Sequence, residues 1–378
     1  MSIVIGADLV PTESNYELFE KAELKTLFGE ELLNIISKAD FRIFNLETPI
    51  TDNKTPINKC GPNLITPTRV ISGIKALGVN LFTIANNHIL DQGEQGFNKT
   101  VELLKENDID FVGGGQNLSE ASKPYVFNFN DKKIGVYACV QHEFSIATEN
   151  QCGANPFDPL ESLDHIVSLK DQCDFVIVLY HGGKEHYRYP SPNLQRTCRK
   201  IIDKGANLVV CQHSHCIGCE EKYNEGTIVY GQGNFIFDHS KSEFWQTSLL
   251  IELDENFSIK YVPIVKKENV VRLAEQKASE NILEEFFDRS KAISNFGFVQ
   301  NEYDRFSNVA IDLYLWGIST KKYGLCFRAL NKISGYRFSK WYIKRKYTFK
   351  KLLAIQNTIE CETHRELFSN GINSILKR

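Results

Sequence analysis

The segments V-L-Y-H-G-G-K-E at residues 178–185 and L-V-V-C-Q-H-S-H at residues 208–215 both run from apolar residues directly into histidine. The apolar runs are Phe175–Tyr180 in the first case and Leu208–Cys211 in the second. Short apolar runs between helical stretches are typical of buried parallel strands. The histidines therefore stand at the carboxyl ends of strands, where open α/β sheets place their ligand crevices.

Three earlier segments follow the same pattern. The chain opens with a β-branched strand that reaches Asp8, F-R-I-F-N-L-E reaches Glu47, and V-N-L-F-T-I-A-N-N-H reaches Asn87 and His88. Taken separately, Asp8 could be a turn residue, Asn87 could form an Asx-turn and Glu47 could be a surface charge. Carboxylate, amide and imidazole groups at five strand ends instead favour a site for one or two divalent metal ions, with Mn, Zn and Fe as candidates. The expected metal ligands are Asp8, Glu47, Asn87, His181, His213 and His215.

Amphipathic stretches alternate with these strands and predict an α/β fold. Helices are expected at residues 29–38, 69–77, 96–107, 160–172 and 192–204, and further strands near 125–129, 134–140, 227–230, 247–253 and 258–263. Hairpin-like pairs among the later strands favour two mixed sheets flanked by helices, which is a four-layer sandwich. Beyond Val265 the pattern becomes mostly helical, so we expect one domain over 1–265 and a helical region over 266–378.

Four motifs carry a resemblance to a known family. They are N-L-E-T-P (45–49), A-N-N-H-I-L-D-Q-G (85–93), H-G-G-K-E (181–185) and V-Y-G-Q-G-N-F-I-F-D (229–238). In this order and spacing the chain resembles the CapA family over about residues 2–240. These are bacterial capsule and poly-γ-glutamate synthesis proteins with a metallophosphatase-like fold. The resemblance implies the same fold, a metal-dependent hydrolase, and capsule-synthesis proteins as partners.

The resemblance also implies roles for individual residues. Glu47 matches the glutamate that would bridge two metals, and Asn87 matches the amide ligand. His88 would face the leaving group as the catalytic acid, and Asp91 would orient it. Asp8, His181, His213 and His215 match the remaining ligands.

Some positions depart from the family pattern. Gly182 stands where the family has tryptophan, Cys211 where it has glycine and Ser214 where it has proline, and none of these changes removes a ligand. Binuclear phosphatases also carry Asp-x-His at the first strand, and here the histidine position is Val10. One metal position is therefore a ligand short, and occupancy by one or by two metals stays open.

The expected chemistry is metal-assisted attack of hydroxide on a phosphoester, with His88 protonating the leaving oxygen. Arg188 is expected to hold an anionic group of the substrate, and Asn234 to contact the substrate from a tight turn that it forms with Gly231 and Gly233. The substrate would be an anionic polymer or a phosphorylated small molecule. Two alternatives remain open: a non-catalytic component of a capsule-synthesis assembly, and a hydrolase or transferase acting on the amide bonds of poly-γ-glutamate.

Composition indicates a globular protein. The 378 residues exceed one typical domain, and a hydrophobic content of 42% can supply a core. Met1 leads straight into a strand, so no signal peptide is expected, and no apolar run approaches the roughly 18 residues that span a bilayer. The ten cysteines are then expected to be reduced thiols. These features predict a cytoplasmic protein.

Residues 321–351 contain eleven Lys or Arg and no Asp or Glu, with aromatic residues between the charges. We favour a solvated helical face docked on the preceding domain. The alternatives are a surface that binds the inner leaflet of a membrane peripherally, and a groove for a polyanion. No segment resembles a nucleic-acid-binding motif, so nucleic acid is not expected as a partner.

Overall fold

The computed structural model describes residues 1–320 and 325–376. Internal contacts divide it into two units, Met1–Gln300 and Asn301–Arg378. In the first unit, an eight-stranded mixed sheet has the order β16-β15-β14-β1-β2-β3-β4, and β13 also pairs with β1. Its strands are β1 (Ser2–Val10), β2 (Phe41–Leu46), β3 (Leu81–Thr83), β4 (Asp110–Val112), β13 (Asn234–Phe237), β14 (Thr247–Asp254), β15 (Ile259–Lys267) and β16 (Val270–Leu273).

A second, six-stranded mixed sheet has the order β11-β12-β10-β9-β7-β6. Its strands are β6 (Tyr125–Phe129), β7 (Lys132–Val140), β9 (Phe175–His181), β10 (Leu208–Gln212), β11 (Glu220–Tyr223) and β12 (Gly226–Val229), and a small separate ladder joins β5 (Gly114–Gly115) to β8 (Gly153–Ala154). Strands β6 and β7 form one of the expected hairpin-like pairs. Asn130 and Asp131 both have left-handed φ, 51° and 59°, as a tight two-residue hairpin requires.

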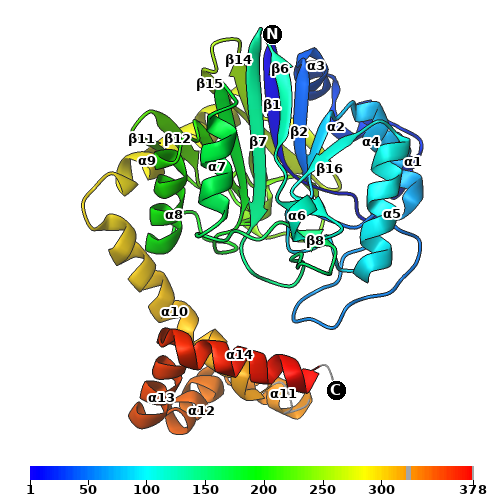
Figure 1. Ribbon diagram of the computed structural model, residues 1–378. Coiled ribbons are helices and arrows are strands. Elements are labelled where there is room, and N and C mark those ends of the chain that lie inside the picture. The colour runs from blue at the N-terminus through cyan, green and yellow to red at the C-terminus, as the bar shows by residue number, and fades with distance from the viewer. Residues whose placement is uncertain (321–324, 377–378) are drawn as a thin grey trace. The chain divides into compact units, whose positions relative to one another are not determined.

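Helices cover the outer faces of both sheets (Figure 1). The helices of this unit are α1 (Tyr16–Glu20), α2 (Leu24–Phe28), α3 (Glu30–Lys38), α4 (Ile71–Leu77), α5 (Gly93–Glu106), α6 (Leu118–Ala121), α7 (Ser162–Lys170), α8 (Pro192–Asp203) and α9 (Gln276–Ile293). Helix α8 begins as the sequence predicts, because Pro192 lies in its first turn and the Ser191 hydroxyl accepts a hydrogen bond from the Leu194 amide at 3.1 Å.

Side-chain alternation along the strands builds the layers. In β1, Ile3 and Ile5 point into the core between the two sheets, and Val4 points into the core beneath the helices. In β9, Ile177 faces the inter-sheet core and Val178 faces the outer helices. Because side chains alternate along a strand, each apolar run supplies two cores at once. The expected four-layer, metallophosphatase-like sandwich is confirmed.

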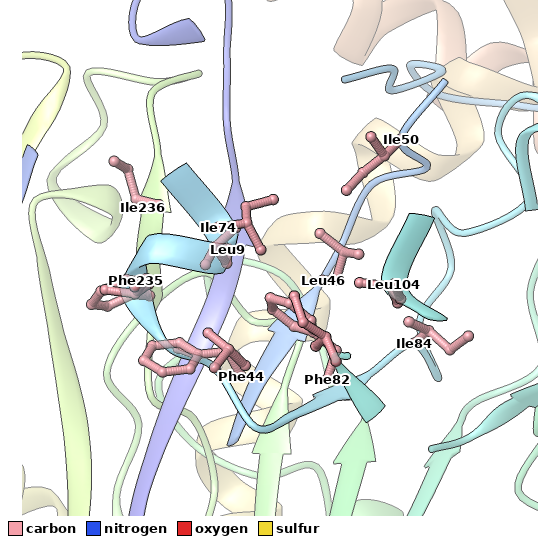
Figure 2. Close-up of a cluster of buried hydrophobic side chains, with 14 of the residues drawn as sticks. Leu9, Phe44, Leu46, Ile50, Ile74, Phe82, Ile84, Leu104, Phe235 and Ile236 are labelled. Atoms are coloured by element: carbon pink, nitrogen blue, oxygen red, sulfur yellow. The ribbon is translucent and has the colours of Figure 1, made fainter. Parts of the chain in front are cut away.

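Figure 2 shows part of the outer core on the eight-stranded sheet. Phe44 of β2 and Phe235 of β13 lie with ring centroids 4.6 Å apart, and both are fully buried. Leu46, the last residue of β2, lies in the same cluster. Burying one such side chain stabilises the fold by about 1.5–3 kcal/mol, so this packing holds fixed the strand end that carries Glu47.

The chain beyond Val265 is not helical at once. Strand β15 continues to Lys267, β16 follows, and the first helix, α9, begins only at Gln276. Helix α9 packs on β11 and β15, and its Phe286 is fully buried with its ring centroid 4.7 Å from that of Tyr261. Residues 276–293 therefore belong to the first unit by contact, and the domain boundary at residue 265 stays a prediction.

The second unit is helical. Helix α10 (Phe298–Thr320) leads into it, followed by α11 (Leu325–Ile333), α12 (Arg337–Lys346), α13 (Phe349–Glu360) and α14 (Glu362–Leu376). Part of the basic segment, 321–324, lies outside the described residues, and its expected docking on the first domain stays a prediction. Within the described ranges, no helix is both long and apolar enough to cross a membrane.

Candidate metal centre

The strand ends singled out in the sequence meet in space. Asp8 lies near the carboxyl end of β1, and Glu47 directly follows β2. His181 is the last residue of β9, and β10 ends one residue before His213. The donors thus come from both sheets. This convergence is the geometry that the strand-end pattern predicted.

Two overlapping groups of donors define the centre. Glu47, His181 and His213 each offer one ligand atom, and these atoms lie within 4.8 Å of one another. Asp8, Glu47 and His215 do the same. All five residues are buried, and Glu47 belongs to both groups. A carboxylate shared between two donor groups is the arrangement that lets one side chain bridge two cations.

Amide oxygens complete each group. Around His181, Nε2 lies 3.2 Å from Glu47 Oε1, 3.1 Å from Asn87 Oδ1 and 3.2 Å from His213 Nδ1. Around His215, Nδ1 lies 3.6 Å from Asp8 Oδ2 and 2.8 Å from Asn234 Oδ1. The six predicted ligands are therefore brought together, and Asn234 joins them. Their action as ligands stays a prediction.

The donor set fits a divalent cation. Asp8 Oδ2 and both carboxylate oxygens of Glu47 are buried without a hydrogen-bond partner among the residues that the structure describes. Leaving a buried polar group unpaired costs about 1–3 kcal/mol, and more when the group is charged. Three such oxygens converging beside three imidazoles are the chemistry that a metal ion satisfies.

The surroundings shift the pKa values of His213 and His215 in opposite directions. Burial, together with His181 and His215 nearby, holds the pKa of the His213 imidazole well below its usual range, which keeps it neutral and able to ligate. Burial alone would also lower the pKa of His215, but Glu47, Asp8 and Asn234 outweigh burial and raise it to about 9. Burial would raise the pKa of the Asp8 carboxyl, but His215, His181 and Asn45 together hold it below its usual value.

Metal affinity should therefore depend on pH. His215 carries a proton below about pH 9 and must release it to ligate, so binding at its position should strengthen by about tenfold per pH unit up to that value and then level off. Competition for Mn²⁺ between the protein and a chromophoric chelator measures the affinity at each pH. The same titration of Mn²⁺ and chelator without protein is the control. An affinity unchanged between about pH 6.5 and about pH 9 would contradict the expectation.

The His-x-His segment has a strained backbone. His213 and His215 have φ of 91° and 54°, in the left-handed region that non-glycine residues rarely adopt. Such conformations cost on the order of 1–3 kcal/mol each and persist where the surrounding structure imposes them. Gly231 lies against this segment, where an added Cβ would stand 2.7 Å from Ser214 Oγ. The turn around Gly231 and Gly233 therefore lets the β13 strand approach the histidines closely.

Asn45 and Asn86 belong to the centre but were not predicted. The Asn45 side-chain amide donates to Asp8 Oδ1 at 2.7 Å and lies 3.3 Å from His181 Nδ1. Asn86 in turn donates to Asn45 Oδ1 at 3.0 Å and to the Leu46 carbonyl at 2.8 Å. These linked amide side chains therefore hold Asp8 and His181 in orientation. Both residues belong to the quoted motifs, Asn45 to N-L-E-T-P and Asn86 to A-N-N-H-I-L-D-Q-G, and this is the signal that could have identified them.

His88 and Asp91 form the expected pair at the edge of the centre. His88 Nδ1 lies 2.6 Å from Asp91 Oδ2, so Nε2 is the ring nitrogen left to face a ligand. Asp91 also accepts from the Leu64 amide and pairs with the ammonium of Lys59, whose side chain is almost fully buried and whose Nζ lies 3.3 Å from His88 Nδ1. Lys59 was not predicted, because a loop lysine carries no periodic signal.

Arg188 is engaged with other groups. Its guanidinium donates to the Ile217 carbonyl and to Glu243, both at 3.2 Å, and lies 4.9 Å from the Phe244 ring centroid. Asn234, in contrast, is within the centre, and it begins strand β13 instead of standing in the turn before it. The substrate contacts expected of both residues stay predictions.

Two facing mixed sheets with outer helices, and potential donors gathered at the strand ends, define a metallophosphatase-like fold. The family model described as bacterial capsule synthesis protein PGA_cap matches residues 2–239, and the chain belongs to this family. All the expected motifs lie within that range.

Curated relatives agree with the family. The chain is 29% identical over 212 residues to the capsule biosynthesis protein CapA of Bacillus anthracis, covering 54% of this chain and 52% of the relative. It is 30% identical over 208 residues to the PGA biosynthesis protein CapA of Bacillus subtilis, covering 54% and 55%. The chain thus spans about half the length of these relatives. Among solved structures, a phosphatase from Mycoplasma pneumoniae matches with a TM-score of 0.44 and 16% identity, covering 71% of this chain and 94% of that one.

Proposed function

We propose that the protein is a metal-dependent phosphoesterase-like hydrolase that acts in the synthesis of a capsule or another polyanionic exopolymer. The observation that carries the proposal is the sharing of Glu47 between two buried donor groups, with its carboxylate oxygens unpaired. The names of the curated relatives support the polymer context. We propose Mn²⁺, Zn²⁺ or Fe²⁺ as the cofactor, because mixed imidazole and carboxylate donors suit these ions.

The residues divide the chemical work. A divalent ion, when bound, polarises a phosphoryl oxygen and makes water a stronger nucleophile at neutral pH. Glu47 and Asp8 supply the negative charge that holds the cation, and Asn45 keeps Asp8 and His181 oriented. His88, fixed through Nδ1 by Asp91, would donate a proton from Nε2 to the leaving oxygen.

The same donor cage could polarise an acyl oxygen, so hydrolysis or transfer at the amide bonds of poly-γ-glutamate is the second candidate. A third is a non-catalytic component of a capsule-synthesis assembly. The paired His88 and Asp91 beside the donors favour catalysis over a purely structural site, because a structural site has no need for an oriented acid.

The test is reconstitution followed by a substrate screen. Metal-free protein would be loaded with Mn²⁺, Zn²⁺ or Fe²⁺ and assayed on generic phosphoesters and on γ-linked glutamyl peptides. We expect metal-dependent turnover of phosphoesters. Turnover of the peptides alone would replace the phosphoesterase proposal with the amide-bond one. Stable metal binding without turnover of either class would favour the non-catalytic role.

We also propose that the basic segment binds an anionic lipid surface, which would place the protein peripherally at the inner face of the membrane. On helices α12 and α13, basic residues and large apolar residues are exposed together, six of the first kind and five of the second. The basic residues are Arg337, Lys340, Lys344, Arg345, Lys350 and Lys351, and the apolar ones are Trp341, Phe349, Leu352, Leu353 and Ile359. Arg345 lies over the Trp341 ring at 5.5 Å from its centroid. Exposed aromatic residues among basic ones suit the boundary of anionic headgroups.

Binding to anionic vesicles should weaken steeply with salt. Reversing three charges to glutamate, at Lys344, Arg345 and Lys346, should lower affinity for the vesicles by at least about a hundredfold. Each basic residue near such a surface contributes about 1 kcal/mol, and the glutamates add repulsion. Sedimentation at low and high salt measures this. A variant reversed at Lys75, Lys132 and Lys277, exposed on the first unit, should bind normally. Absence of salt-sensitive binding by the unmodified protein would refute the lipid proposal.

A further inference from the structure

The two donor groups at the metal centre are built on one plan. In the group around His181, an amide oxygen, Asn87 Oδ1, lies 3.1 Å from an imidazole nitrogen, and Glu47 completes the set with His213. In the group around His215, an amide oxygen again lies beside an imidazole nitrogen, at 2.8 Å, and it belongs to Asn234. Each group therefore contains the shared glutamate, an imidazole, an amide and one further donor.

We propose that Asn234 is a metal ligand, the fourth donor of the position formed by Asp8, Glu47 and His215. The proposal rests on the metal dependence of the proposed function. It gives that position four protein donors, as many as the group around His181 has. The ligand that the sequence lacks at Val10 is thereby supplied from a different strand.

Strand pairing explains how Asn234 reaches this place. Strand β13 pairs in parallel with β1, and Asn234 is the partner of Asp8 in their register. The register shifts immediately after this pair, which sets the Asp8–Asn234 step apart from the regular ladder. The positive φ of Gly233, 82°, turns the chain directly before Asn234. The fold therefore brings an amide and a carboxylate side by side at the strand end.

Unpaired atoms mark the same point. Asn234 Nδ2 is buried without a hydrogen-bond partner in the described part of the chain, as are Asp8 Oδ2 and the Glu47 oxygens. A side chain placed only to support His215 would need one partner, and its other polar atom would stay unpaired at a cost of about 1–3 kcal/mol. Coordination through Oδ1 leaves Nδ2 to donate to an oxygen of a bound substrate, the contact expected of Asn234 from the sequence.

The test counts metal ions on the full-length protein. Metal-free protein would be equilibrated with defined free Mn²⁺ and analysed for bound metal and for the spin-coupled electron paramagnetic resonance signal of a Mn²⁺ pair. We expect two ions in the unmodified protein. Asn234→Ala should lower the affinity for the second ion by at least about tenfold and should remove the coupled signal. Even changes to residues outside the ligand set weaken metal binding by roughly 10–100-fold.

Two further variants keep the result interpretable. Asn234→Asp retains an oxygen donor and adds negative charge, so it should bind two ions at least as tightly as the unmodified protein. If Asn234→Ala does not fold, the affinity of Asn234→Asp is the test of the ligand assignment. Asn207→Ala is the matched control, because Asn207 Oδ1 accepts from the Val176 amide at the amino ends of β9 and β10, and it should bind normally.

The outcomes separate the two proposals. Two results would overturn the ligand assignment alone. In the first, Asn234→Ala binds two Mn²⁺ ions as tightly as the unmodified protein does. In the second, Asn234→Asp binds Mn²⁺ more weakly than Asn234→Ala does. A single ion in the unmodified protein that Asn234→Ala leaves unchanged would also overturn it. Failure of the unmodified protein to bind any divalent ion would overturn the proposed metal dependence, and this inference with it.

Discussion

Replacing Glu47 with glutamine should abolish both metal positions at once. Glu47 is fully buried and is the donor common to both groups, so no other single substitution among the predicted ligands reaches both. Metal analysis after dialysis should find the variant free of metal. Turnover should fall by about a thousandfold or more, because metal catalysis supplies several kcal/mol and each 1.36 kcal/mol is a factor of ten in rate.

Thermal unfolding gives an independent measurement of the same change. Metal at a hundred times its dissociation constant should stabilise the unmodified protein by about 2.7 kcal/mol for each ion bound, and should leave Glu47→Gln unaffected. Glu252→Gln, at a partly exposed carboxylate that pairs with Lys260 on β15, is the matched control and should respond to metal normally. Two ions retained by Glu47→Gln would contradict the bridging role.

Replacing His88 with alanine should separate catalysis from binding. The variant should keep its metal and lose about 10²–10⁴-fold in turnover of phosphoesters with poor leaving groups, because a general acid contributes that much. Activated esters, such as nitrophenyl phosphates, should suffer far less, since their leaving group needs no proton. Steady-state rates on a pair of substrates that differ only in the leaving group measure the difference.

His165 offers the control for His88. It lies in helix α7, where its Nδ1 is 3.2 Å from the Tyr137 hydroxyl, and His165→Ala should leave both rates unchanged. Asp91→Asn is a less direct test, because it would leave the buried ammonium of Lys59 without its carboxylate. Equal losses on both substrates, or loss of metal from His88→Ala, would remove His88 from the acid role.

The elements that the sequence predicts correctly are those whose pattern depends on their own residues. Strands β9 and β10 are buried on both faces, so nearly every residue in them is apolar and the run is visible in the sequence alone. Their ends are equally visible, because a polar residue follows at once. Short elements whose stability comes from distant partners were missed. Strand β13 has four residues, and it is a strand because β1 lies beside it.

The same distinction applies to the site. The six expected ligands stand at strand ends, so a rule about sheet edges could predict that they converge. Lys59 lies in the loop between β2 and α4, and only the folded chain brings it to Asp91, 32 residues away. Asn234 was expected to contact substrate from a turn, because its glycine-flanked motif hides the parallel pairing with Asp8. Long-range pairing of this kind leaves no periodic signal in the sequence.

The division of donors between two sheets has a mechanical consequence. Asp8, Glu47 and Asn234 lie in or directly after strands of the eight-stranded sheet. His181, His213 and His215 lie at or just after the ends of strands of the six-stranded sheet. Away from the centre, side chains such as Ile5 and Leu179 join the sheets through apolar contact, which resists separation but has little directional preference. An ion coordinated from both sides would act as a cross-link, fixing the sheets in register at the edge where substrate must enter. Loss of the ion would then loosen the sandwich from that edge inward.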